Sequence, residues 1–136
     1  MRVLGIESSS LVASVALVTD DILTAEYTVD FKKTHSQTLL PMLDEIVKLL
    51  ELDMDTIDAI AVAGGPGSFT GLRIGAATAK GLGLALKKPL VHVPTVDAMA
   101  YNMWGGRGAY LSYYGRKTQP GLYGAIPYQG RPGGGD

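Results

Sequence analysis

The residues with the clearest chemical potential form a glycine-rich run, GGPGSFTG, at positions 64–71. An apolar stretch precedes it at 59–63, and a helix-like segment follows it at 72–86. Glycines at such a strand-to-helix turn let the backbone pass close to another group, and the N–H groups of the helix start then point at that group. The run is therefore compatible with a phosphate site, with a tight contact to a partner, or with a turn that needs glycine for its backbone angles.

The spacing of reactive side chains gives little support for a standard nucleotide-binding loop, a metal site or a protease. The run is neither a Walker loop, since no Lys-Ser or Lys-Thr pair follows it, nor a Rossmann turn. His35 and His92 each lack a second histidine at ligand spacing, so we predict no metal site. A serine protease is disfavoured because no histidine stands in a motif with the available hydroxyls of Ser8, Ser9, Ser10 and Ser68.

Apolar patterning places these residues on an α/β scaffold. Three strands are predicted to pair as an antiparallel meander, and a buried strand leads into the glycine-rich run. The predicted strands are residues 3–7, 11–18, 22–29, 58–63 and 90–93, and the predicted helices are residues 36–50, 72–86 and 95–103. We expect Pro41 in the first turn of its helix, Ser68 or Thr70 as a cap of the second, and Thr95 as the cap of the third.

The second predicted helix carries a stripe of small residues. Four of them recur at every fourth position and so share one face: Gly71, Gly75, Ala79 and Gly83. Glycine inside a helix costs about 1 kcal/mol relative to alanine, so this pattern indicates that another backbone comes close. That neighbour is either another chain or the sheet and first helix of the same domain.

Composition sets broad limits. The chain has 136 residues, enough for one domain with a core, and a formal net charge of −1, which gives no general attraction for nucleic acid. It contains no cysteine, which excludes disulfides and thiolate metal sites. Because we find neither a signal peptide nor an apolar run of membrane-spanning length, we expect a cytoplasmic protein without membrane contact.

The predicted order βββαβαβα resembles one lobe of the actin-like (ribonuclease H-like) ATPases. Four segments narrow the resemblance to the TsaB (YeaZ) family of bacterial tRNA threonylcarbamoyladenosine biosynthesis proteins. They are LGIESS at 4–9, HSQTLLP at 35–41, GGPGSFTGLR at 64–73 and PTVDA at 94–98. The resemblance covers residues 1 to about 106, roughly the first half of a typical member.

This resemblance implies a non-catalytic partner of TsaD, the enzyme that transfers threonylcarbamoyl to adenosine in tRNAs reading ANN codons. It implies TsaD and TsaE as partners, a homodimer, contact with tRNA only through the complex, and no metal. ATP or ADP with Mg²⁺ is expected only in the complex. The implied partner surface lies on the two N-lobe helices and takes in His35, Leu39, Met42, Gly71, Arg73, Gly75 and Ala79.

The resemblance to actin-like proteins also suggests an alternative, an ATPase or kinase lobe. In those proteins the turn after the first strand holds phosphate, so the candidate nucleotide-binding residues are Glu7, Ser8, Ser9, Gly65 and Gly67. Glu7 is compatible with a place near Mg²⁺, but we favour an ordinary acid at the end of a strand.

Residues 107–136 differ from the rest in composition. They hold eight of the 18 glycines and five of the seven tyrosines, and they show no helical or strand period. Back-translation of this tail and a shift of one base yields DARRNQVY, a stretch with which family members continue. We therefore predict a domain at 1–106 and an irregular, out-of-frame tail at 107–136, a hypothesis that sequencing the gene around the codons for residues 105–108 tests.

Overall fold

The computed structural model describes residues 1–30, 35–101, 109–113 and 123–127, with side chains described up to Tyr101 except those of His35 and Ser36. Within these ranges a mixed sheet has the strand order β3-β2-β1-β4-β5. The five strands are β1 (Arg2–Glu7), β2 (Ala13–Thr19), β3 (Ile22–Val29), β4 (Ala59–Ala63) and β5 (Leu90–Val93). Strands β1, β2 and β3 form the predicted antiparallel meander, and β4 runs parallel to both β1 and β5.

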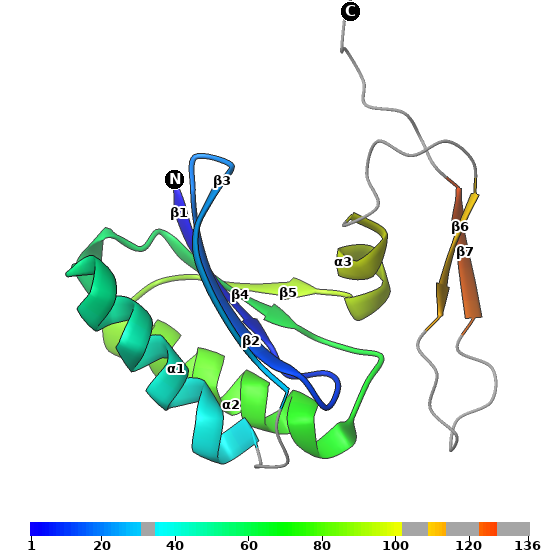
Figure 1. Cartoon of the computed structure of the whole chain (residues 1–136), viewed down its shortest axis with the longest axis horizontal. Helices are drawn as coiled ribbons and strands as arrows, with labels where there is room; N and C mark the ends of the chain where they lie inside the picture. Colours follow the sequence, from blue (N-terminus) through cyan, green and yellow to red (C-terminus); the bar gives the residue numbers. More distant parts are fainter. Residues whose placement is uncertain (31–34, 102–108, 114–122, 128–136) are drawn as a thin grey trace, which may run out of the picture.

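Two long helices lie side by side against one face of this sheet, while α3 lies on the other side (Figure 1). The helices are α1 (His35–Leu50), α2 (Phe69–Leu86) and α3 (Thr95–Tyr101), and a short 3-10 turn, η1 (Met54–Thr56), precedes β4. The core fills the layer between the sheet and the two long helices, where Leu4, Leu39 and Ile60 are at most 1% exposed. The predicted order βββαβαβα is confirmed.

Helix α1 departs from the prediction at one residue. Pro41 stands inside the helix, as its seventh residue, rather than in the first turn. A proline there removes a backbone donor and disfavours helix. Burial explains why the helix continues, because Leu39, Met42, Leu43 and Ile46 all lie in the core. Tertiary packing of this face outweighs the local preference.

Helices α2 and α3 differ in how the backbone groups at their first turns are capped. Ser68 caps α2 by accepting a hydrogen bond from the N–H of Gly71, and Lys87 closes its far end in the left-handed conformation. The prediction that Thr95 caps α3 is wrong. Thr95 is the first helical residue, its buried hydroxyl has no hydrogen-bond partner among the described residues, and the Pro94 carbonyl accepts from Asp97 and Ala98 instead.

The small residues of α2 face the sheet of the same domain. All four residues of the stripe are buried, and the Ser8 hydroxyl donates to the carbonyl of Gly71 over 2.8 Å. A Cβ added at Gly75 would stand 2.2 Å from Ser8 Oγ, and one at Gly83 would stand 2.8 Å from Leu90 Cδ2. Of the two neighbours that the stripe allowed, the sheet of this domain is therefore the right one.

We predict that Gly75→Ala lowers the free energy of unfolding by about 1–3 kcal/mol, because the new methyl group overfills a closed contact with Ser8. Gly81→Ala is the matched control. It changes a glycine of the same helix with nothing within 4 Å, and it should raise stability by roughly 0.5–1 kcal/mol. Urea unfolding of both variants measures the difference, and equal effects would contradict the close packing.

Residues beyond 106 contain an antiparallel pair of strands, β6 (Ala109–Tyr113) and β7 (Tyr123–Pro127), where the sequence predicted no strand. The other residues of the predicted tail lie outside the described ranges. The domain boundary near 106 and the out-of-frame origin of the tail stay predictions. Among the described helices, none is long and apolar enough to span a membrane.

Candidate functional site

The carboxyl ends of β1, β4 and β5 meet where the glycine-rich run enters α2. Backbone hydrogen bonds tie the three ends together: the N–H of Ser68 donates to Ser9 at 2.7 Å, that of Gly64 to Val93 at 2.9 Å, and that of Thr95 to Gly65 at 2.8 Å. In parallel α/β sheets, ligands bind at this edge. Here the edge is closed by contacts within the chain.

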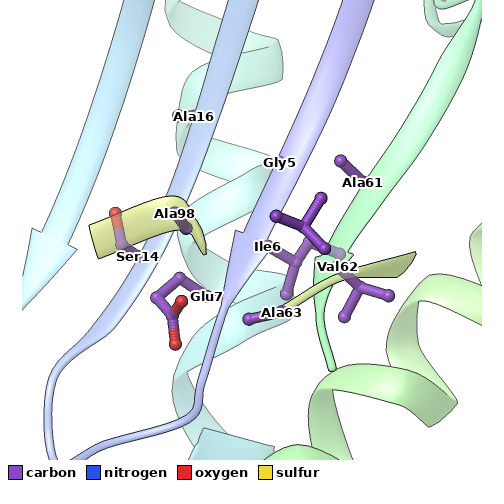
Figure 2. Close-up of a pocket in the computed structure, with 10 residues that line it drawn as sticks. Gly5, Ile6, Glu7, Ser14, Ala16, Ala61, Val62, Ala63 and Ala98 are labelled. Atoms are coloured by element: carbon purple, nitrogen blue, oxygen red, sulfur yellow. The ribbon is translucent and has the colours of Figure 1, made fainter. Parts of the chain in front are cut away.

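Glu7 ends β1 at this edge, and its carboxylate already has partners. It accepts a hydrogen bond from the backbone N–H of Ser9 at 2.6 Å and a second from the Ser9 hydroxyl. Beside it, on the α3 side of the sheet, lies a shallow hollow of about 200 Å³ (Figure 2). Its walls carry mostly small apolar side chains, and its lining includes no cation, so a bound phosphate would face a carboxylate without a compensating positive charge.

The predicted nucleotide-binding residues therefore come together in space, with structural contacts of their own. Ser8 and Ser9 are buried, and Gly65 adopts a φ of 106°, which a side chain would strain. A Cβ at Gly67 would stand 2.5 Å from the Ser9 carbonyl oxygen, so glycine is needed for this approach. No cluster of three potential metal ligands occurs in the part of the chain with described side chains.

We expect Ser68→Ala to destabilise the chain by about 1 kcal/mol, because the N–H of Gly71 loses its capping oxygen. Ser68→Asp should restore most of this stability, since a carboxylate caps a helix start equally well. Thermal unfolding of the two variants is the measurement. Equal losses in both would show that the cap does not hold the glycine-rich run to α2.

The outer surface of the two long helices is the second candidate site. Large apolar side chains stand exposed there, with Leu84 of α2 83% exposed, Phe69 of α2 69% and Leu40 of α1 54%. The Arg73 guanidinium lies over the Phe69 ring, 5.3 Å from its centroid. Exposed apolar groups rimmed by such a cation are typical of protein-binding surfaces.

The predicted partner residues divide between the core and this surface. Leu39 and Met42 are core residues, so their assignment to an interface is wrong. The same holds for Gly71, Gly75 and Ala79, because their face of α2 is buried against the sheet. Arg73 is exposed as an interface residue should be, and the side chain of His35 lies outside the described residues.

The outward positions that the prediction missed are Leu40, Phe69, Ala77 and Leu84. The last three share the face opposite the small-residue stripe, each within the spacing that keeps α2 residues on one side. The spacing of the stripe located both faces correctly. It did not show which of them was the inner one.

Comparison with known proteins identifies the family. A family model described as "TsaD: tRNA N6-adenosine threonylcarbamoyltransferase" matches residues 29–125. The chain is 38% identical over 109 residues to the tRNA threonylcarbamoyladenosine biosynthesis protein TsaB of Escherichia coli, covering 80% of this chain and 47% of that protein. The chain belongs to the TsaB (YeaZ) family.

A further TsaB protein agrees with this assignment, and a solved structure shows the same fold. TsaB of Bacillus subtilis is 34% identical over 102 residues, covering 75% of this chain and 44% of that protein. The chain thus spans about half the length of the curated TsaB proteins that it matches. The solved structure of YeaZ from Pseudomonas aeruginosa has the same fold, with a TM-score of 0.77 at 24% identity over 93% of this chain and 67% of that one.

Proposed function

We propose that this TsaB-type chain acts in the formation of threonylcarbamoyladenosine in tRNA as a non-catalytic partner of TsaD. The observation that carries the proposal is the exposed apolar surface of α1 and α2, formed by Leu40, Phe69, Ala77 and Leu84. TsaD docks on this surface. In its absence a second copy of the chain takes its place, and TsaE and tRNA join through the complex.

The hydrogen bonds of polar side chains in the described region support a role in protein–protein pairing over a catalytic one. The carboxylate of Glu7, which ends β1, is held by Ser9, and the Ser8 hydroxyl donates to the carbonyl of Gly71. Neither group is poised beside a base or a metal ligand set in the described region. We expect ATP or ADP with Mg²⁺ to bind only where TsaD completes the site.

We predict that Leu84→Glu weakens co-purification with TsaD at least about tenfold, because a charge would be desolvated in an apolar contact. Leu11→Glu is the matched control. It places the same charge at an equally exposed leucine, 86% exposed, that belongs to the loop between β1 and β2 and to neither long helix. Equal retention of TsaD by both variants would contradict docking on α1 and α2.

Titration calorimetry with ATP and Mg²⁺ separates this proposal from the alternative of an actin-like ATPase or kinase lobe. The isolated chain should give no binding heat, because the hollow beside Glu7 lacks a cation to meet phosphate. Tight binding by the chain alone would favour the enzyme. The Glu7→Gln variant should also give no binding heat. This result would show that repulsion by the Glu7 carboxylate is not the reason why the chain does not bind ATP.

A further inference from the structure

A groove between α2 and β5 adjoins the apolar helix surface, with which it shares Phe69 and Arg73, and it has a charge and shape that the proposed function does not use. It measures about 490 Å³, and Arg73, Lys80 and His92 line it together with Phe69, Leu72 and Leu90. None of the residues that line it in the described region is acidic. In a chain with a net charge of −1, this is a local concentration of positive charge.

Helix α2 and strand β5 run in opposite directions, and this sets the order of their side chains along the groove. Gly83, near the end of α2, lies against Leu90, and Gly64, the residue after β4, lies against His92. Arg73 and Lys80 are seven residues apart on one helix, a separation of about 10 Å along its axis. The groove therefore has a positive charge toward each end and an apolar floor between them.

Strand β5 forms the edge of the sheet beside this groove, and the described residues place no strand outside it. The carbonyl of Pro89 accepts a hydrogen bond from Ile60 of β4, and that of Val93 accepts one from Gly64, the residue after β4. Backbone groups alternate in direction along a strand, so those of Leu90 and His92 point to the open edge. These are the same two residues whose side chains line the groove.

We propose that this groove binds an extended acidic segment of a partner protein, which adds to the sheet along β5. The segment's backbone pairs with the open N–H and C=O groups of Leu90 and His92. Every second side chain of the segment then enters the groove, with acidic groups meeting Arg73 and Lys80 and an apolar group between them on Leu72 and Leu90. The groove shares Phe69 with the surface proposed above for docking on α1 and α2, but the strand pairing along β5 does not rest on that docking.

The test uses three fluorescein-labelled peptides with the whole chain. The first is Glu-Thr-Leu-Thr-Glu-Thr, which places Glu, Leu and Glu on one face of a strand. The second has Lys in place of both Glu residues. The third keeps the first sequence but carries N-methyl groups at alternate residues, so that one backbone edge cannot donate hydrogen bonds. Anisotropy gives affinity, and amide NMR shifts give location.

We expect the first peptide to bind and to shift the amides of Leu90–Val93, while the lysine and N-methyl peptides bind at least about tenfold more weakly. Lys80→Glu should cost the first peptide about tenfold. Lys48→Glu, at an exposed lysine of α1, should change its affinity less than about twofold. Circular dichroism of both variants checks that they fold alike.

Three results would overturn the proposal. Equal binding of the N-methyl peptide would mean attraction by charge without strand addition. Shifts of the β5 amides by ATP, with none from the first peptide, would make the groove a small-molecule site. Shifts of those amides with the concentration of the chain alone, again with no peptide response, would make it a contact between copies of this chain.

Discussion

The close contact between the inner face of α2 and the end of β1 is the constraint on which the rest of the structure depends. Small residues on this face let the helix lie flush on the sheet, and Ser8 fills the space that a side chain at Gly75 would take. The same contact brings Ser9 against Ser68 and so fixes the glycine-rich run. A bulkier inner face would lift the helix off the sheet and separate the strand ends that meet there.

The packing of α2 against the sheet determines two exposed surfaces. Because the helix turns its small residues inward, its larger ones, such as Phe69 and Leu84, are left exposed on its outer side. Because it lies flush, its flank stands close enough to β5 for Arg73 and Lys80 to share a groove with His92. The pairing surface and the charged groove thus adjoin each other on one helix and share Phe69 at its start.

The sequence predicted the strands and helices well, because their apolar patterns are long and their ends carry clear signals such as Ser68 before α2. It was less informative about which neighbour each face of a helix contacts. Gly71, Gly75 and Ala79 mark a close approach, yet spacing alone does not distinguish a neighbouring chain from the domain's own sheet. The burial of Ala79 shows that the neighbour is the sheet.

The position of Pro41 in α1 was predicted wrongly because local preference gave way to core packing, and Leu39 and Met42 proved to be part of that core. The groove beside β5 was missed because its residues come from three elements, the end of β4, α2 and β5, and only the fold brings Lys80 and His92 together.

A double-mutant cycle between Ser8 and Gly75 tests the central contact most directly. If the methyl group of an alanine at Gly75 collides with the Ser8 hydroxyl, then Ser8→Ala should make room for it. We expect the cost of Gly75→Ala, measured by urea unfolding, to fall by about 1 kcal/mol or more in the Ser8→Ala background. Strictly additive costs would mean that the two residues do not touch, and that α2 is held to the sheet in some other way.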